Sequence, residues 1–189
     1  AQIYQDMWEL PDALAYQQKA TRIQEQVLGE NHPQLISYYN ILSNIHEAME
    51  EFAEAFAYQQ KAIAIHEQVL GENHPQLISS YNSLSNIYRA MGQFAEAAAC
   101  RQKAIRIQEQ ILSKNHPQFI NSYNSLSNIY RAMGQFADAL VYRQKATHIQ
   151  EQTLGKNHPQ LTSSYGNLSD IYKAMGQLPD ALAYQQKAT

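Results

Sequence analysis

Charged residues are scarce in this sequence. They make up 16% of it, and 14 Lys and Arg nearly balance 17 Asp and Glu. The net charge of −3 gives no basic surface for nucleic acid or an anionic membrane, so we expect neither as a partner. No run approaches the ~20 apolar residues that a membrane-spanning helix requires. Amide side chains are abundant instead, with 24 Gln and 12 Asn. The predicted surface therefore carries more amide groups than charged groups.

Cysteine is almost absent. Cys100 is the only one, which excludes an intramolecular disulfide. The chain does not open with a charged segment followed by an apolar stretch, as a signal peptide would. Both features favour a reducing, intracellular setting, and we expect a cytoplasmic protein.

Patterns typical of catalysis or cofactor binding are also missing. The sequence has no Gly-rich phosphate loop and no Ser, His and Asp arrangement, and no His or Asp partner recurs around Cys100. Four histidines do recur at one spacing, at His32, His74, His116 and His158. Stacked helices lie about 8–10 Å apart, too far for these imidazoles to share a zinc ion, so we expect helix-junction residues. We predict no metal, no cofactor and no enzymatic activity.

What the sequence does contain is a repeat. Asn-His-Pro-Gln begins at Asn31, Asn73, Asn115 and Asn157, a period of 42 without insertion or deletion. We therefore interpret residues 1–189 as a single repeat array with three full repeats between two partial ones: 1–32, 33–74, 75–116, 117–158 and 159–189. Both ends fall inside a repeat, so we expect a fragment of a longer array.

Each repeat is predicted to form two helices. Pro75 suits the first position of a helix, and apolar residues follow at helical spacing from Leu77 to Met91. Gly92 supplies a left-handed residue to end this helix, and a second helix is expected from about Phe94 to Leu112. One pair cannot cover its own apolar face, so neighbours must stack. The predicted fold is all-α, an α-solenoid (superhelix) of stacked antiparallel helix pairs.

These residues resemble the tetratricopeptide repeat, with small residues where the two helices cross. The pattern is Tyr81-x-x-Leu84-Ser85-x-x-Tyr88-x-x-x-Gly92-x-Phe94-x-Glu96-Ala97, followed by Ala104. The 42-residue period and the Leu-Gly-x-Asn-His-Pro junction, Leu70 to Pro75, resemble the kinesin-light-chain variety. Midway along the second helix the family usually has an aromatic residue, which this chain replaces with Gln59, Arg101 and Arg143.

Polar residues of the first helix would line the concave side of such an array. With Tyr81 and Leu84 turned to the core, Asn82, Asn86 and Arg89 share the other face, because they stand four and three positions apart. Their counterparts form rows, and the predicted peptide-binding residues are Asn40, Asn44, Asn82, Asn86, Arg89, Asn124, Asn128, Arg131 and Lys173. Glu47 reverses the charge in the first full repeat and Gly166 removes an amide in the last. The best site is therefore expected in the second and third full repeats, reaching Lys173.

An Asn amide has donors and an acceptor, so rows of Asn can pair with the backbone of an extended peptide, while the basic row selects acidic residues. The resemblance implies the same role, since kinesin-light-chain repeats hold extended cargo peptides with Asn and basic residues. We predict a protein-interaction scaffold or adaptor that binds an extended, acidic peptide of a protein partner. Three alternatives stay open. The rows are unused surface copied by duplication, or the chain is a structural module that self-associates end to end, or it is the sensor region of a larger regulatory protein.

Two further sets of residues have simpler interpretations. Tyr39, Tyr81, Tyr123 and Tyr165 recur at core spacing, so we expect buried tyrosines with their hydroxyls at the edge of the core. The alternative is an aromatic cage for a ligand. His46, His66 and His148 each occur in one repeat only, and we expect them at the surface or at its rim.

Overall fold

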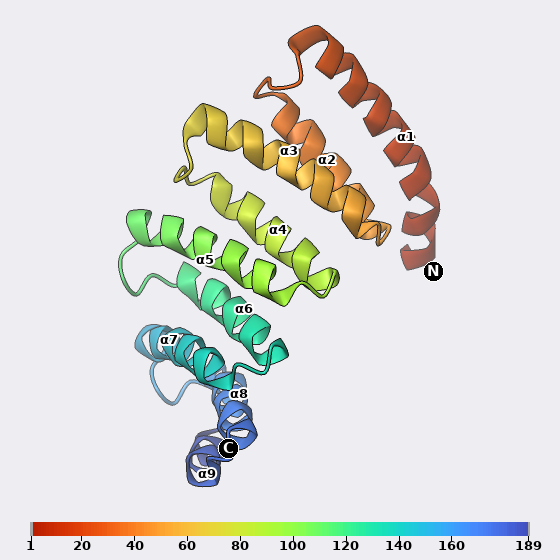
Figure 1. The fold of residues 1–189 in the computed structure, drawn as a ribbon. Helices are drawn as coiled ribbons and strands as arrows, with labels where there is room; N and C mark the ends of the chain where they lie inside the picture. The colour runs from red at the N-terminus through yellow and green to blue at the C-terminus, as the bar shows by residue number, and fades with distance from the viewer. Residues whose placement is uncertain (1, 189) are drawn as a thin grey trace. The chain divides into compact units, whose positions relative to one another are not determined.

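The computed structural model describes the backbone of residues 2–188 and the side chains of residues 10–188. These residues form nine α-helices and no strand, which confirms the all-α prediction (Figure 1). The helices are α1 (Gln2–Leu28), α2 (Leu35–Ala48), α3 (Phe52–Leu70), α4 (Leu77–Ala90), α5 (Phe94–Ile111), α6 (Gln118–Ala132), α7 (Phe136–Leu154), α8 (Leu161–Ala174) and α9 (Leu178–Lys187).

The chain divides into two compact units. Unit 1 is Ala1–Gln93 and holds α1 to α4, and unit 2 is Phe94–Thr189 and holds α5 to α9. Within each unit every helix packs against the next helix along the chain. The repeat boundaries of the single array stay a prediction.

Glycine turns end the first helices, as predicted. Gly92 and Gly134 are left-handed, with φ of +74° and +72°. After α6, the N–H of Gly134 donates to the carbonyl of Arg131 (3.0 Å), and the N–H of Gln135 donates to the carbonyl of Tyr130 (2.9 Å). Glycine adopts this conformation at little cost because it has no Cβ, and the two hydrogen bonds satisfy carbonyls at the helix end.

The recurring histidines lie at helix junctions, which confirms their predicted role. Nδ1 of His74 accepts the backbone N–H of Gln76 at 3.3 Å, and the same bond recurs at His32, His116 and His158. Helix α4 begins at Leu77, two residues later than the sequence predicted from Pro75. The first turn is tighter than an α-helix, because the N–H groups of Leu77 and Ile78 bond to carbonyls three residues back.

Small residues let the two helices of a pair approach closely. Ala55 and Ala139 are fully buried where the second helix crosses the first. The hydroxyl of Ser43 donates to the carbonyl of Ala55 (2.9 Å), and Ser127 does the same to Ala139 (2.8 Å). These bonds pair the serine hydroxyls inside the core. The small residues lie where the two helices cross, as the repeat pattern predicted.

The recurring tyrosines are buried, with hydroxyls that reach the edge of the core. Tyr39 and Tyr165 are 1% and 4% exposed. Their hydroxyls donate to carboxylates of the preceding second helix, Glu25 at 2.7 Å and Glu151 at 2.8 Å. Burial, together with the neighbouring carboxylate, raises the pKa of Tyr39 and raises the pKa of Tyr165 to about 12.

Raising the pH above 10 is expected to destabilise the protein. Because the pKa of Tyr165 is about 12 in the folded chain, against an ordinary value of 10.0 for tyrosine, the native state holds this proton more tightly than the unfolded state. The stabilisation is complete below pH 10 and is lost as the pH rises through the folded pKa. Burial also raises the pKa of Tyr39, Tyr123, Tyr130, Tyr142 and Tyr184, so the effects add.

The measurement is the urea midpoint as a function of pH. We expect it to stay constant from about pH 7 to 9 and then to fall steadily to about pH 11.5, where several tyrosines would have to ionise in the core. A midpoint that does not change over the alkaline range would contradict the expectation.

Two of the three histidines that occur in single repeats are buried, so the prediction of surface or rim positions was wrong for them. His46 is 5% exposed, and its ring stacks on Tyr58 with centroids 5.4 Å apart. The following repeats have a tyrosine at this position, and Tyr130 stacks on Tyr142 as His46 stacks on Tyr58. His66 is 8% exposed, and burial lowers its pKa.

Cys100 is also buried, and burial raises the pKa of its thiol to about 11, which fits a packing role. Among residues 10–188, no three His, Cys, Asp or Glu side chains come together as metal ligands would. The described helices include none with the length and apolar character needed to span a bilayer.

Candidate functional site

Three of the predicted binding residues share one face of α6. Asn124, Asn128 and Arg131 stand four and three positions apart, with Tyr123 and Leu126 buried on the side of the core. Asn128 is exposed, while Asn124 and Arg131 are half-buried. Solvent therefore reaches a row of two amides and one guanidinium on this helix.

A residue of α7, the helix that pairs with α6, contacts this row from the side of the core. Arg143 lies on α7, is 4% exposed, and divides its guanidinium between the two amides. Its Nη1 donates to Oδ1 of Asn124 at 2.6 Å, and its Nη2 donates to Oδ1 of Asn128 at 2.7 Å. Since a guanidinium can only donate, both amide oxygens must point at Arg143. The NH₂ groups of the two asparagines are left as the donors that a ligand can use.

This arrangement leaves positive charge without a partner. Arg143 bonds only to neutral amides, and its buried Nε has no hydrogen-bond partner. Burial lowers the pKa of Arg143, and the nearby Arg131 lowers it further. Neither arginine forms an ion pair with a carboxylate in the described part of the chain. A buried cation is costly unless an anion offsets it, so this face of α6 favours a negatively charged ligand.

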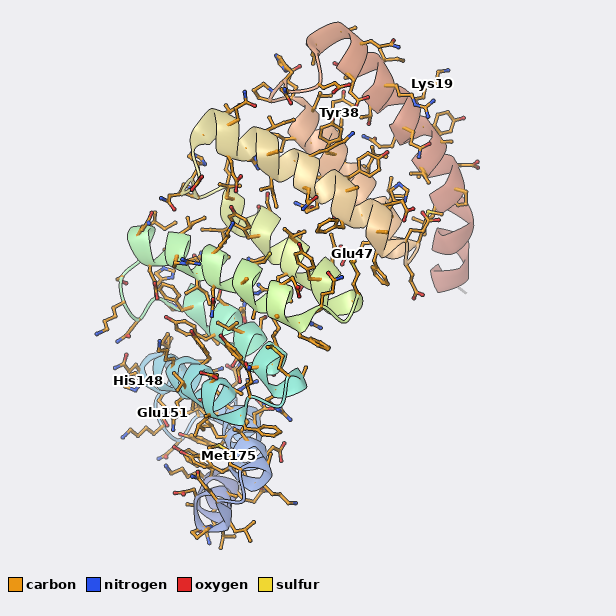
Figure 2. All side chains as sticks on the ribbon, in the orientation of Figure 1. Lys19, Tyr38, Glu47, His148, Glu151 and Met175 are labelled. Atoms are coloured by element: carbon orange, nitrogen blue, oxygen red, sulfur yellow. The ribbon has the colours of Figure 1, made fainter. Side chains whose placement is uncertain are left out.

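The corresponding positions of α2 and α3 in unit 1 keep one of these hydrogen bonds and lack the charge. Gln59 of α3 is 2% exposed, and its Nε2 donates to Oδ1 of Asn40 at 3.3 Å. Asn44 is exposed one turn further along α2, and Glu47 follows it near the end of the helix (Figure 2). A neutral amide and a carboxylate thus stand where unit 2 has two arginines.

Beside Asn40 the surface of unit 1 is hollow. The hollow has a volume of about 490 Å³ and extends from α2 to the start of α4. Ile36, Val69 and Leu70 contribute apolar surface, while Asn40 and Ser79 contribute polar groups. This shape suits an apolar side chain of a ligand that also pairs with the amide row.

The remaining predicted residues lie on two other first helices. Asn82, Asn86 and Arg89 occupy one side of α4, where Asn86 and Arg89 are exposed and Asn82 is half-buried. Lys173 is exposed near the end of α8, on which Gly166 replaces the first amide. A continuous face through the second and third full repeats stays a prediction.

The sequence alone did not assign a role to the second-helix residues at the position of Arg143. Gln59, Arg101 and Arg143 were recognised only as departures from an aromatic position, yet all three are buried, at 2%, 6% and 4% exposure. The signal was available in the helical pattern. Arg143 stands four residues after Ala139 and three before Ala146, both fully buried, so its side chain had to start inside the helix pair.

Comparison with known proteins identifies the family of this chain. The family model of the tetratricopeptide repeat matches the sequence in four overlapping stretches, residues 1–58, 36–110, 79–148 and 118–189. The chain belongs to the tetratricopeptide repeat family. The search of curated proteins gave no match to the sequence.

Several solved structures share this fold. A Podosopora anserina protein designated a kinesin light chain, with nearly identical TPR-like repeats, has a TM-score of 0.83 and 27% identity, over 98% of this chain and 88% of that chain. BtubC (BKLC) from P. vanneervenii has a TM-score of 0.79 and 21% identity, over 97% and 73% of the two chains. MamA has a TM-score of 0.69 and 15% identity, over 97% and 89%. The last two show the fold alone.

The predictions of a tetratricopeptide fold and of kinesin-light-chain-like repeats are therefore confirmed. Tetratricopeptide repeats are general protein-interaction modules, and scaffolds of this type are typically not enzymes.

Proposed function

We propose that this chain is a protein-interaction scaffold that binds an extended peptide carrying acidic side chains. The observation that carries the proposal is the pair Arg131 and Arg143 on unit 2, which has no carboxylate partner in the described residues. An acidic side chain placed beside Arg131 would offset both positive charges. Hydrogen bonds between ionised groups are shorter and roughly twice as strong as neutral ones, so this contact would dominate affinity.

The two asparagines of α6 supply the contacts to the peptide backbone. Because Arg143 holds the oxygens of Asn124 and Asn128, their NH₂ groups are fixed as donors toward solvent. They can pair with carbonyl oxygens of an extended peptide one helical turn apart, without selecting its sequence. Preorganised donors of this kind lower the entropy that a ligand loses on binding.

Unit 1 offers a different contact. Its amide row carries no buried cation, since Gln59 replaces the arginine, and the hollow beside Asn40 accepts an apolar side chain. We therefore infer a peptide that combines acidic residues with at least one apolar residue.

The test is fluorescence polarisation with a labelled extended peptide of alternating Asp and Val, compared with its Asn and Val isostere. We expect saturable binding of the acidic peptide that weakens as salt increases, and much weaker binding of the amide peptide. Changing Arg131→Gln should weaken the acidic peptide by about fivefold, the loss of roughly one charge-assisted contact.

The matched control is Lys156→Gln, which removes one exposed positive charge in the loop between α7 and α8 of the same unit. It should leave the affinity unchanged. Equal binding of the acidic peptide and its amide isostere, or equal weakening by both substitutions, would show that the arginine pair does not select acidic ligands.

A further inference from the structure

The junction between α5 and α6 differs from the corresponding junctions of the other repeats. Gly29, Gly71 and Gly155 end their helices with φ of +83°, +84° and +85°, and Ser113 takes their place after α5. That backbone conformation is nearly restricted to glycine, and Ser113 is not among the described residues with positive φ. Helix α5 accordingly ends at Ile111, one residue earlier than the pattern of α3 and α7.

The altered junction coincides with the loss of a hydrogen bond. In three repeats a buried tyrosine hydroxyl donates to a glutamate fourteen positions earlier. The pairs are Tyr39 with Glu25, Tyr81 with Glu67 and Tyr165 with Glu151. Tyr123 and Glu109 are the corresponding pair, and neither has a hydrogen-bond partner for its side chain among residues 10–188. Tyr123 is 6% exposed, and its hydroxyl is a donor that a ligand can use.

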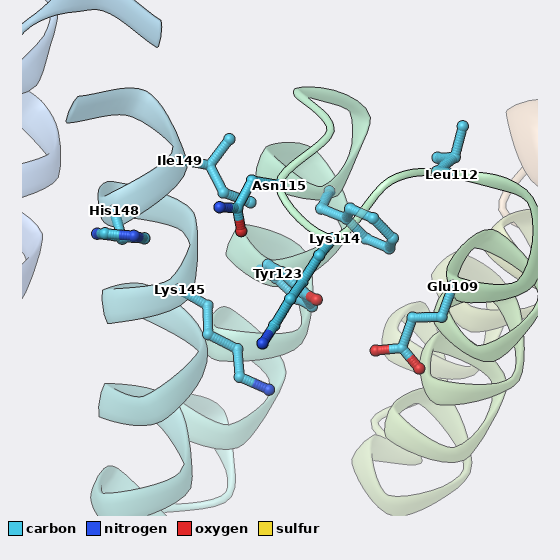
Figure 3. Close-up of a pocket in the computed structure, with 9 residues that line it drawn as sticks. Glu109, Leu112, Lys114, Asn115, Tyr123, Lys145, His148 and Ile149 are labelled. Atoms are coloured by element: carbon cyan, nitrogen blue, oxygen red, sulfur yellow. The ribbon is translucent and has the colours of Figure 1, made fainter. Parts of the chain in front are cut away.

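A cavity of about 550 Å³ lies between these two side chains (Figure 3). Its floor is aromatic and apolar. Phe119 is 1% exposed, and its ring stacks on Tyr123 with centroids 5.3 Å apart and an angle of 13° between the planes. Ile149 of α7 extends the floor. Small-molecule sites in proteins have volumes of roughly 300–1,000 Å³ and mostly apolar linings with a few polar groups.

The rim of the cavity carries a net positive charge. Lys114 and Lys145 extend into the opening, and Glu109 faces them from α5 (Figure 3). The Nζ of Lys145 lies 5.5 Å from the ring centroid of Tyr123. None of the three charged side chains forms an ion pair in the part of the chain that the structure describes. Two ammonium groups thus remain available for one anionic group of a ligand.

Hydrogen bonds tie the wall of the cavity to α7. Nδ2 of Asn115 donates to Oε1 of Gln152 at 2.9 Å, and Nε2 of Gln152 lies 2.9 Å from Nε2 of His148. This chain of hydrogen bonds joins the altered junction to the helix that carries Lys145. The wall is therefore held in place before a ligand arrives, which reduces the cost of binding.

We propose that this cavity binds a small aromatic monocarboxylate. The aromatic ring occupies the apolar part of the cavity beside Phe119 and Tyr123, and the carboxylate accepts hydrogen bonds from the Tyr123 hydroxyl and the two lysines. Glu109 opposes a second negative charge, so the site selects a monoanion over a phosphate dianion. The site is distinct from the peptide-binding residues of α6, none of which line the cavity.

The test is calorimetric titration with 2-naphthoate, 2-naphthamide and acetate, with chemical shifts of Ile149 and Phe119 recorded by NMR. We expect saturable binding of 2-naphthoate that shifts both residues, at least about fivefold weaker binding of the neutral amide, and no binding of acetate. Ser113→Gly restores the residue of the other junctions. It should close the cavity, raise the melting temperature and weaken 2-naphthoate by at least about tenfold.

Lys114→Gln tests the charge without changing the backbone of the junction. It should weaken 2-naphthoate by about fivefold at an unchanged melting temperature, whereas Lys156→Gln, the same position one repeat later, should have no effect. Arg131→Gln should also leave 2-naphthoate binding unchanged, which separates this site from the peptide-binding residues. Equal affinity for 2-naphthoate and 2-naphthamide, or undiminished binding by Ser113→Gly, would overturn the proposal.

Discussion

Replacing Arg143 with glutamine is expected to weaken binding of an acidic peptide by about tenfold while leaving the protein at least as stable, a loss of ~1.4 kcal/mol in binding. Arg143 is 4% exposed and bonds only to the neutral amides of Asn124 and Asn128. Folding therefore buries a charge that nothing in the described chain neutralises. Exchanging such a group for a neutral one of similar size is often neutral or stabilising.

Unit 1 shows that glutamine fits this position. Gln59 is the counterpart of Arg143, is equally buried, and donates to Asn40. Arg143→Gln should thus keep one hydrogen bond to the amide row, while it removes the charge and the second hydrogen bond. The combination of higher or equal stability with lower affinity is the signature of a residue retained for binding.

The measurement pairs peptide affinity with the urea midpoint of the same variant. Arg143→Ala is the contrasting change, because it leaves two amide oxygens without their donor and creates a cavity, and it should cost about 2–4 kcal/mol of stability. If Arg143→Gln lowers the midpoint as much as Arg143→Ala, the guanidinium is a structural bridge. Unaltered peptide affinity in Arg143→Gln would show that its charge does not reach the ligand.

The regular part of the fold follows from the sequence because it depends on local rules. Helical spacing marks Leu77, Tyr81 and Leu84 for the core, and all three are buried. Glycine at position 92 ends the first helix because few other residues adopt its backbone conformation cheaply. The corresponding turn one repeat earlier is an exception, because Glu50 takes the place of glycine there at a φ of +60°. A preference for glycine alone does not predict it.

The candidate sites follow less directly, because they depend on where long side chains end. The spacing of Asn124, Asn128 and Arg131 predicts a shared face, and α6 has it. Nothing in that spacing shows that Arg143 of the next helix spans the core and takes both amide oxygens. Likewise, the substitution of Ser113 for glycine is visible in the repeats, but the sequence does not show that Glu109, Phe119 and Tyr123 line a cavity beside this junction.

Replacing Gly155 with alanine is expected to destabilise the protein by about 1–3 kcal/mol, the cost of holding a residue with a Cβ in a conformation that only glycine adopts readily. Gly155 ends α7 with φ of +85° and ψ of 146°. A Cβ added there would meet no atom within 4 Å, so the cost comes from the backbone and not from a clash. The chain can escape it only by ending α7 early, as α5 does before Ser113.

Early termination of α7 has a second consequence that a simple packing defect lacks. The hydroxyl of Tyr165 donates to Glu151 at 2.8 Å and to the carbonyl of Lys156 at 3.2 Å, and both partners flank Gly155. If the junction changes as it does after α5, these bonds break and the pKa of Tyr165 falls from about 12 toward its ordinary value. Tyrosine ionisation followed by ultraviolet absorbance should then begin at lower pH in Gly155→Ala than in the parent chain.

Gly166→Ala is the matched control, since Gly166 lies inside α8 of the same unit with an ordinary helical φ and no atom within 4 Å of an added Cβ. Alanine loses less backbone freedom than glycine in a helix, so this change should stabilise the protein by about 0.5–1 kcal/mol. The two substitutions are chemically identical and are predicted to shift the urea midpoint in opposite directions. If both shift it the same way, the positive φ of Gly155 is not what sets the junction, and the origin of the cavity at Ser113 would need another cause.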